Sequence, residues 1–463
     1  MIFEQHYLEC LSQASYFIGD ESSGRAVVVD PRRDISPYLE TASEHGMTIE
    51  MAIETHFHAD FLSGHLELAA ATGAQIGYGS AAETEFESRK LADGERIELG
   101  QVVLEIRHTP GHTPESISVV VFEHAGDTEP YGVLTGDTMF VGDVGRPDLL
   151  SSIGVTSEEL AGQLFESLHD QLLTLPDSTK VYPAHGAGSS CGKNLSSETW
   201  STIGAQRSDN YALAPMSKAD FVTVVTEGQT APPAYFSFDA MLNRENRPLL
   251  DEAVEPTAMP LTEVVKAQES GAVVLDTRDP NEFASGHIIG SVNIGLAGRY
   301  AEFAGGVLDP VSAIVLLTEH GMEREAKNRL ARIGFDNVIG FLEEPLAAMA
   351  ANPDHVARGS RLDVAALKRS QDSIEDLQLV DVRQPGETEG GFIPGAILMP
   401  LTRLNERLDS LDRSKPTVIY CAGGFRSSIA ASRMIAAGFS DVSDLLGGYG
   451  AWEAAAAGDE VVA

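Results

Sequence analysis

Histidine and acidic side chains recur at four places in the first half of the sequence. Each segment puts them on a turn after an apolar strand, and loops at strand ends are where binding and catalytic residues concentrate. Imidazole nitrogens and carboxylate oxygens are typical ligands of iron and zinc. One pair of histidines is weak evidence, but four such segments indicate a metal centre. The segments are THFHAD from Thr55, HTPGHTPES from His108, LTGDTMFVGDVGRPD from Leu134 and YPAHG from Tyr182.

Phe61 directly follows the first segment, at a position where another metal ligand would be expected. The segment itself offers His56, His58 and Asp60, whereas a phenyl ring cannot bind a metal ion. Hydrolysis at a two-metal site depends on both ions, which hold the attacking water and the substrate between them. Phe61 therefore favours a centre with one metal ion over a dinuclear hydrolytic centre.

A second kind of chemistry is indicated near the end of the chain, in VIYCAGGFRSS. Cys421 follows an apolar strand, Arg426 lies five positions later, and the next residues are expected to form a helix. Successive backbone N–H groups and the positive end of the helix dipole lower a thiol pKa and favour the nucleophilic thiolate. The alternative is a buried, inert cysteine, which the two glycines and the arginine disfavour.

The elements that position these residues follow from the pattern of apolar residues. Up to about Gly192, short apolar strands alternate with turns rich in glycine, proline and histidine, and helices are expected between some of them. This mixture indicates an αβ sandwich. The predicted strands are GRAVVVDP, QVVLEIRH, SISVVVFE and YGVLTGD, and the predicted helices are FLSGHLELAAATG and TSEELAGQLFESLHDQLLTL.

An internal repeat determines the organisation of the second half. The segment that begins VVLDTRDPNEF at Val273 matches LVDVRQPGETE at Leu379, and AIVLLTEHG at Ala313 matches TVIYCAGG at Thr417. Each copy contains a strand, a loop and a helix, repeated, which is typical of a parallel α/β domain. We therefore predict a multidomain α/β protein with domains at 1–240, 255–350 and 360–463.

The first copy of the repeat lacks the residues that make the second one reactive. An alignment without gaps that pairs Gly334 with Gly438 puts Leu317 opposite Cys421 and Met322 opposite Arg426. The segment LLTEHGMERE has no cysteine and no glycine pair, and its acidic residues would repel an anionic sulfur donor. We predict that this copy is catalytically inactive and that it packs, spaces the active domains or supports oligomerisation; a retained ligand site stays open.

Composition limits the partners and the compartment. The 463 residues carry a formal net charge of -37, which disfavours nucleic acid and anionic membranes because both need basic surface. No apolar run reaches the roughly 18 residues that span a bilayer, and the start of the chain lacks the features of a signal peptide. Three cysteines in so long a chain fit a reducing compartment. We expect a cytoplasmic protein that forms a homo-oligomer.

The four histidine and acidic segments, in their order, resemble the metallo-β-lactamase superfamily over the first ~190 residues. Within it, HTPGHTPESIS and GDTMFVGDVGRPDL are similar to the persulfide dioxygenases. The resemblance implies an αβ/βα sandwich and one Fe(II) per chain. It implies that His56, His112 and Asp137 bind the iron, which leaves positions open for substrate and O2. It also implies that four residues surround the metal without binding it, namely His58, Asp60, Phe61 and His185. The alternative, in which one of these binds and the metal is zinc, stays open.

Two further residues in GDVGRPD are candidates for substrate binding. Arg146, with Asp148 beside it, would offer a fixed positive fork to a thiol that carries a carboxylate, such as glutathione. The alternative is a structural pair between Arg146 and Asp148 within one loop, and the sequence does not decide between them. Asp143 in the same stretch is expected to be a turn residue.

Residues 361–463 resemble rhodanese, a sulfurtransferase, through VIYCAGGFRSS, DVRQPGETEGGFIPGA and LLGGYGAW. The resemblance implies that Cys421 accepts a sulfane sulfur as a persulfide. A phosphatase shares this fold, but its loop is typically one residue longer, so the length of the loop here favours the transfer of sulfur over that of phosphate. One departure is Phe392, at a position where rhodaneses often carry a histidine. The loop implied to cradle the persulfide consists of Ala422, Gly423, Gly424, Phe425 and Arg426.

The complete order is similar to bacterial persulfide dioxygenase–rhodanese fusions, with a metallo-β-lactamase sandwich followed by two rhodanese-like domains. The resemblance implies oxidation of a thiol persulfide, carried by glutathione, coenzyme A or a similar thiol, with O2 to sulfite. It also implies sulfur transfer at Cys421 that forms or uses thiosulfate. Two alternatives remain. One is a zinc-dependent thioester hydrolase like glyoxalase II, fused to a sulfurtransferase, and the other is a non-catalytic carrier or sensor of sulfane sulfur.

Overall fold

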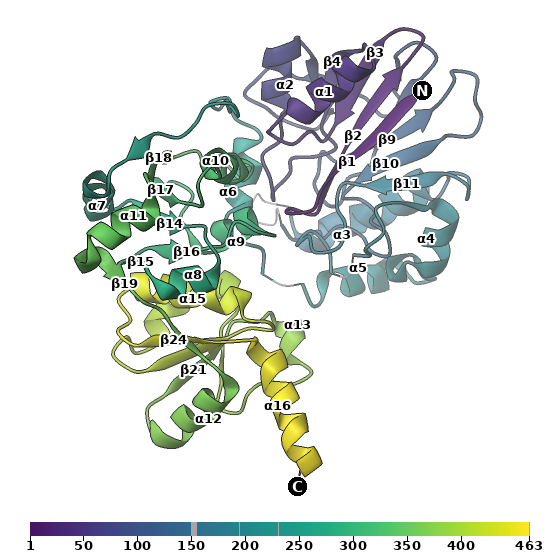
Figure 1. The fold of residues 1–463 in the computed structure, drawn as a ribbon. Helices are drawn as coiled ribbons and strands as arrows, with labels where there is room; N and C mark the ends of the chain where they lie inside the picture. The colour runs from purple at the N-terminus through teal and green to yellow at the C-terminus, as the bar shows by residue number, and fades with distance from the viewer. Residues whose placement is uncertain (150–154, 194, 230, 463) are drawn as a thin grey trace. The chain divides into compact units, whose positions relative to one another are not determined.

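The computed structural model describes residues 1–149, 155–193, 195–229 and 231–462 (Figure 1). They form two compact units. The first consists of Met1–Glu252 with Ala331–Gly334, and the second of Ala253–Leu330 with the chain from Phe335 onward. Within the described residues, no helix is both long enough and apolar enough to cross a membrane.

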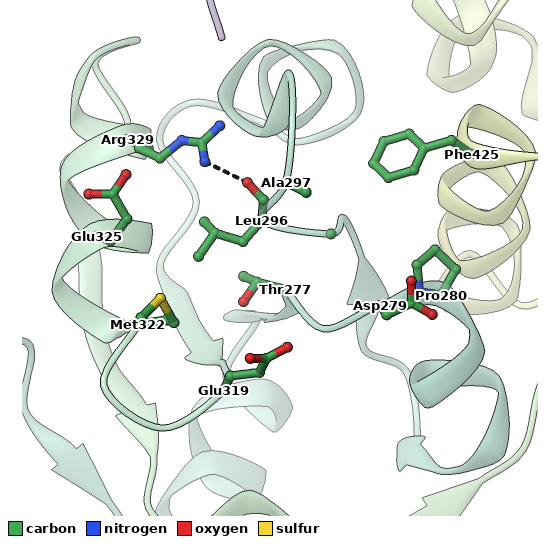
Figure 2. Close-up of a pocket in the computed structure, with 11 residues that line it drawn as sticks. Thr277, Asp279, Pro280, Leu296, Ala297, Glu319, Met322, Glu325, Arg329 and Phe425 are labelled. Carbon is green, nitrogen blue, oxygen red and sulfur yellow. Dashed lines mark hydrogen bonds between the residues drawn. The ribbon is translucent and has the colours of Figure 1, made fainter.

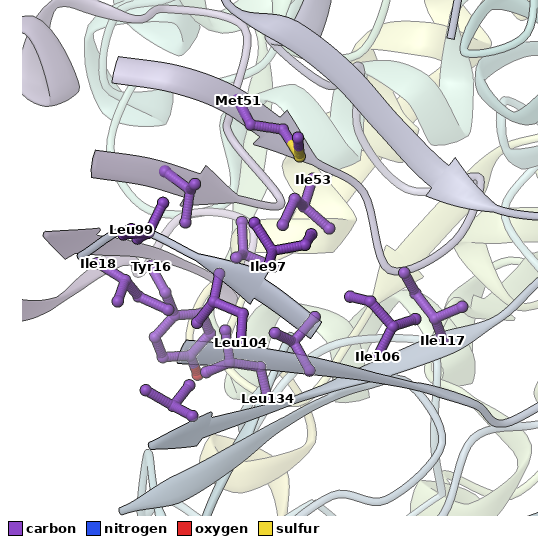
Figure 3. Packing of buried hydrophobic residues seen from close by; sticks show 14 of the residues in the cluster. Tyr16, Ile18, Met51, Ile53, Ile97, Leu99, Leu104, Ile106, Ile117 and Leu134 are labelled. Carbon is purple, nitrogen blue, oxygen red and sulfur yellow. The ribbon is translucent and has the colours of Figure 1, made fainter. Parts of the chain in front are cut away.

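Two sheets of six strands face each other in the first unit (Figure 3). Their inward side chains share one apolar core, which includes Ile53 and Val27 from one sheet and Leu104 and Leu134 from the other. In order across the first sheet, the strands are β1 (Ile2–Leu8), β2 (Gln13–Asp20), β3 (Arg25–Val29), β4 (Thr48–Ile53), β5 (Gln75–Gly79) and β6 (Arg89–Leu91). Across the second they are β12 (Ser201–Thr202), β11 (Lys180–Pro183), β10 (Gly132–Gly136), β9 (Ile117–Phe122), β8 (Val103–His108) and β7 (Arg96–Glu98).

Helices cover the outer face of each sheet, because the strands alternate their side chains between two apolar layers. Val27 points into the shared core, whereas its neighbour Val28 packs with Tyr38 and Leu68 from the helices outside. The predicted αβ sandwich is therefore confirmed, with layers in the order helix, sheet, sheet, helix. The helices of this unit are α1 (Ser36–Glu44), α2 (His65–Thr72), α3 (Ser157–Glu166), α4 (Ile203–Asp209), α5 (Lys218–Thr226) and α6 (Phe236–Leu242).

The second unit contains the two copies of the repeat, each built on a parallel sheet of five strands. Corresponding strands occupy the same places in both sheets, which confirms the repeat seen in the sequence. The first sheet runs β13 (Ala258–Met259), β18 (Val338–Leu342), β17 (Ile314–Leu317), β14 (Val273–Asp276) and β16 (Val292–Asn293). The second runs β20 (Ser360–Leu362), β24 (Val442–Leu445), β23 (Thr417–Tyr420), β21 (Gln378–Asp381) and β22 (Ile397–Leu398).

The helices of the second unit also correspond in sequence order. A further pair of short antiparallel strands, β15 (His287–Ile288) and β19 (Val356–Ala357), joins the start of the first copy to its end. The first copy contains α7 (Leu261–Glu269), α8 (Pro280–Ser285), α9 (Tyr300–Val307), α10 (Glu323–Ala331) and α11 (Pro345–Ala351). The second contains α12 (Val364–Ser373), α13 (Pro385–Thr388), α14 (Leu404–Arg407), α15 (Phe425–Ala436) and α16 (Gly448–Val462).

A buried ion pair marks equivalent positions in the two copies. Arg278 donates to Asp276 at the end of β14, and Arg383 donates in the same way to Asp381 at the end of β21. Each arginine lies two residues after its aspartate and is buried with it. The two aspartates therefore fix the structural alignment of the copies.

This alignment corrects the one made without gaps. Asp276 pairs across the sheet with Leu317, whereas Asp381 pairs with Tyr420. The residue at the place of Cys421 is therefore Thr318, which follows Leu317. The alignment without gaps was wrong by one position. The stretch from Leu317 to Gly334 in the first copy is one residue shorter than the stretch from Tyr420 to Gly438 in the second. The first copy still offers no thiol at this place.

Candidate metal centre and sulfur-transfer site

Three side chains from separate strand ends converge inside the first unit. His56 follows β4, His112 follows β8 and Asp137 directly follows β10. All three are buried, and their ligand atoms lie within 4.8 Å of one another. Nε2 of His112 lies 3.5 Å from Oδ2 of Asp137, and Nε2 of His56 lies 3.8 Å from it. Among the described residues, that oxygen has no hydrogen-bond partner. Two imidazoles and a free carboxylate oxygen fit one metal ion.

Neighbouring groups fix which nitrogen of each ring faces this point. Nδ1 of His112 lies 2.9 Å from the carbonyl oxygen of Arg146, so it must donate there. The hydroxyl of Thr55 donates to Asp30 at 2.9 Å and therefore accepts from Nδ1 of His56, also at 2.9 Å. Both rings thus keep the Nε2 lone pair toward Asp137, as metal-binding histidines do.

The ionisation states also suit metal binding. Burial lowers the pKa of both His56 and His112, so the rings are neutral near pH 7. Burial alone would raise the pKa of Asp137, but the imidazoles of His185, His56 and His112 outweigh it and hold the pKa of that carboxyl well below its ordinary value. Neutral imidazole and ionised carboxylate are the forms that bind a metal.

His58 directs its Nε2 to two further carboxylates. Its Nε2 lies 3.1 Å from Asp30 and 3.5 Å from Glu54, both buried. Burial would lower the pKa of His58, but the two carboxylates raise it to about 10. Asp30 and Glu54 had not been singled out in the sequence. Asp30 ends the apolar strand GRAVVVD, and that position is the signal that could have identified it.

His185 connects two carboxylates beside the centre. Its Nδ1 lies 2.7 Å from Asp137 and its Nε2 lies 2.8 Å from Asp60. His58, Asp60 and His185 form a second group of potential ligands, whose donor atoms lie within 4.8 Å of one another. The alternative in which one of these residues binds the metal therefore stays open. Phe61 is 1% exposed, and its ring centroid lies 4.3 Å from that of His58 and 6.3 Å from that of His185.

Cys191 is a further buried group at this centre. Its thiol, Asp137 and His185 have ligand-type atoms within 4.8 Å of one another. Burial raises the pKa of this thiol well above its ordinary value, and the carboxylates of Asp60 and Asp137 act in the same direction. No motif surrounds Cys191 in the sequence, because only the fold brings it to the centre.

The cysteine of the second copy lies at the end of its central strand. Cys421 follows β23 and is 1% exposed. The backbone N–H of Gly424 donates to its Sγ at 3.1 Å, and Sγ lies 3.6 Å from Oγ of Ser427. Gly424 has a φ of 97°, a conformation that favours glycine, and helix α15 begins at the next residue. The positive end of α15 thus faces the sulfur, while Ala422 and Gly423 leave the loop open to solvent.

Comparison with known proteins agrees with both sites. Residues 8–185 match the metallo-beta-lactamase superfamily, and residues 261–351 and 363–455 each match the rhodanese-like domain. The mitochondrial persulfide dioxygenase ETHE1 of Bos taurus is 30% identical over 239 residues, which are 50% of this chain and 82% of that protein. The Homo sapiens protein is 29% identical over 233 residues, with the same two shares. The chain belongs to the persulfide dioxygenase family.

A solved structure extends the similarity beyond the first unit. A metallo-beta-lactamase from Staphylococcus aureus subsp. aureus COL is 34% identical to this family member, with a TM-score of 0.66. The match covers 74% of this chain and 99% of that one. A metallo-beta-lactamase fold followed by two rhodanese-like domains is therefore the architecture of this persulfide dioxygenase family member. The family implies a metal, and the buried donor set of His56, His112 and Asp137 fits one.

Arg146 of this family member forms an ion pair with Asp148 in the same loop. Its Nε and Nη2 each donate to Asp148 at 2.8 Å, and its Nη1 donates to the carbonyl oxygen of Ser190 at 3.1 Å. The guanidinium is buried, which is the arrangement that the structural alternative predicts. Through its carbonyl oxygen, Arg146 also orients His112. Asp143 is more than a turn residue, since it is buried and accepts from Lys193 N and Tyr211 Oη.

The first copy of the repeat contacts a residue of the Cys421 loop. A cavity of about 410 Å³ lies where its own loop follows β17, and Phe425 of the second copy forms part of the wall (Figure 2). The ring centroid of Phe425 lies 5.5 Å from that of Phe303. Farther along α15, Ser432 Oγ accepts from the backbone N–H of Asn293 at 2.9 Å. The inactive copy thus packs against the helix that begins at the reactive loop.

Proposed function

We propose that the first unit is a persulfide dioxygenase with one ferrous ion, and that Cys421 transfers sulfane sulfur. The observation that carries the first part is the convergence of His56, His112 and Asp137 on one unpartnered carboxylate oxygen, with Phe61 in place of a further ligand. The overall reaction is RSSH + O2 + H2O → RSH + SO3²⁻ + 2 H⁺. A ferrous ion held there would donate electrons to O2, which zinc cannot do.

The chain's own residues would prepare this site in three ways. Asp30, through Thr55, keeps the Nε2 lone pair of His56 pointing inward, and the carbonyl of Arg146 does the same for His112. Phe61 contributes an apolar wall that excludes water beside the ligands. Asp137 stays ionised and holds the metal, and it takes no proton from the substrate.

At the second site, the thiolate of Cys421 would attack the outer sulfur of a persulfide, RSSH. The new S–S bond forms as the RS–S bond breaks, and RS⁻ leaves with the electron pair. Sulfite can then accept the sulfur from Cys421 to give thiosulfate. The hydrogen bond from Gly424 holds the sulfur of Cys421 at the N-terminus of α15, where the attack begins.

Oxygen uptake tests this proposal. Iron-loaded protein should consume O2 with a panel of low-molecular-weight persulfides and release sulfite, while zinc-loaded protein should not. Cys421→Ser should abolish thiosulfate formation and leave O2 uptake with pre-formed persulfide intact. Stoichiometric zinc, no O2 uptake and hydrolysis of a glutathione thioester would instead establish the hydrolase alternative.

A further inference from the structure

An ion pair joins the Cys421 loop to helix α13. Arg426, the residue of the loop that carries positive charge, directs both of its Nη atoms to Glu387, each at 2.6 Å from a different carboxylate oxygen. Glu387 belongs to α13, which comes from the loop after β21. Both side chains are partly exposed, at 21% for Arg426 and 36% for Glu387, so the pair borders solvent.

Both members of this pair are charged near pH 7. The hydrogen bonds from Arg426 to Glu387 raise the pKa of the guanidinium. Burial would raise the pKa of Glu387, but the hydrogen bonds from Arg426 and from the N–H of Gln384 outweigh it and lower that pKa. The pair therefore carries no net charge, and the guanidinium fork of Arg426, which could bind an anion in two places, is occupied by Glu387.

Sulfur donors differ in the charge that they bring to this pair. Thiosulfate is a dianion, and the guanidinium that could bind it is occupied by Glu387. An organic persulfide carries at most one negative charge on its sulfur. We propose that Glu387 is a specificity-determining residue of the Cys421 site, which disfavours dianionic donors and favours organic persulfides by occupying Arg426. The inference rests on the proposed sulfurtransferase function.

Both transfers are balanced and differ in the leaving group. With thiosulfate, the thiolate of Cys421 attacks the outer sulfur, the S–SO3 bond breaks and SO3²⁻ leaves with the electron pair. With a persulfide, the same attack on RSSH releases RS⁻. In both cases Cys421 ends as a persulfide, so the difference lies in whether the donor and the leaving group are dianions that a free guanidinium of Arg426 would bind.

Glu387→Gln removes this charge while it keeps the local fold. Oε2 of Glu387 also accepts from the backbone N–H of Gln384 at 2.9 Å, as part of the capping box that begins α13. A glutamine oxygen can accept the same bond, so the variant should fold. Glu389→Gln provides the matched control, because Glu389 is exposed in the same short segment.

The experiment compares two donors, thiosulfate and the persulfide of 2-mercaptoethanol, whose carrier is uncharged. Cyanide is the acceptor in the full-length protein, thiocyanate is measured, and the uncatalysed rate is subtracted. Glu387→Gln should raise kcat/KM for thiosulfate about fivefold through a lower KM, the size expected for one partly exposed charge. It should change kcat/KM for the persulfide by less than about twofold. Glu389→Gln should change neither.

A second comparison tests whether Glu387 acts through Arg426. In an Arg426→Met background, Glu387→Gln should no longer improve the use of thiosulfate relative to the persulfide. An unchanged ratio of the two donors in Glu387→Gln, or an equal loss with both, overturns the inference while the sulfurtransferase function stands. Wild-type protein with no Cys421-dependent transfer from either donor overturns both.

Discussion

The imidazole of His56 depends on a carboxylate two contacts away. Asp30 fixes the hydroxyl of Thr55 as an acceptor, and that hydroxyl in turn fixes the tautomer of His56. Such outer partners of a metal ligand typically change metal affinity by about 10- to 100-fold when they are removed. Asp30 is therefore a positioning residue, although it does not touch the predicted metal.

Asp30→Asn should weaken metal binding by about 10- to 100-fold. The amide would place an N–H group where Thr55 or His58 now finds an acceptor, which releases the constraint on His56. Competition with a chelator measures the affinity. Asp127→Asn, at an exposed turn, is the control, and sulfur transfer by Cys421 should be unchanged in both variants. An unchanged affinity would show that the tautomer of His56 does not depend on Asp30.

Phe61→His should convert the centre to one that binds two metal ions. The new imidazole would lie beside His185 and Asp60, which already form a second group of potential ligands with His58. We expect about two zinc ions per chain instead of one, because a ligand is restored to the greater part of a second site. Metal analysis of zinc-loaded variant and wild-type protein measures this. One ion in both would contradict the role given to Phe61.

At the scale of elements, helix α15 serves two purposes. Its first turn approaches the thiol of Cys421, and its side packs against the inactive copy through Phe425 and Ser432. The inactive copy thus holds the helix on which the reactive loop depends. This gives the copy without a thiol a definite structural role, since a loop is only as ordered as the elements that support it.

Phe425→Ala should slow sulfur transfer by about tenfold and leave O2 uptake unchanged. The substitution removes the ring that lies against Phe303 and lines the cavity, so the loop loses one of its supports. The thiocyanate assay gives the rate, and the pH dependence of Cys421 alkylation reports whether the thiolate is less favoured. Phe392→Ala, an exposed ring at 46% in the same copy, is the control. Wild-type rates and alkylation would contradict this role of Phe425.

The sequence marked His56, His112 and Asp137 as candidate ligands because each lies in the loop after an apolar strand, and strand ends meet at one edge of a sandwich. It could not decide the role of Arg146, since a bidentate pair with Asp148 depends on the turn of the loop rather than on spacing. It also missed Cys191 and Glu54, which approach the centre from distant parts of the chain. Thr318 was missed because a one-residue difference between the copies is visible only in the register of the strands.

At the scale of the whole molecule, the charge of -37 is the dominant property. Like charges repel across a compact state more than across an expanded chain, so the net charge lowers the free energy of unfolding. Salt should therefore stabilise the protein. We expect Tm to rise steadily between low salt and about 1 M NaCl, where the Debye length falls to roughly 3 Å.

Two controls separate screening from other effects of salt. Sodium sulfate at equal ionic strength separates screening from the exclusion of ions from the protein surface. Screening should raise Tm equally with both salts, whereas exclusion should make sulfate raise Tm much more than chloride. A non-ionic osmolyte such as sucrose should not reproduce the early part of the rise, at salt concentrations where screening changes most. A flat Tm across NaCl concentrations would show that acidic repulsion is already balanced within the fold.

The two parallel sheets of the second unit have the same strand order, yet only one ends its central strand in a thiol. The first copy has no thiol in the loop after β17, so we expect that loop to tolerate more substitutions than the strands and the surface that meets α15. Saturation mutagenesis of this copy should therefore find many tolerated substitutions in the loop after β17 and few in the strands or in the surface that meets α15. In the other copy, the loop itself should be the least tolerant part.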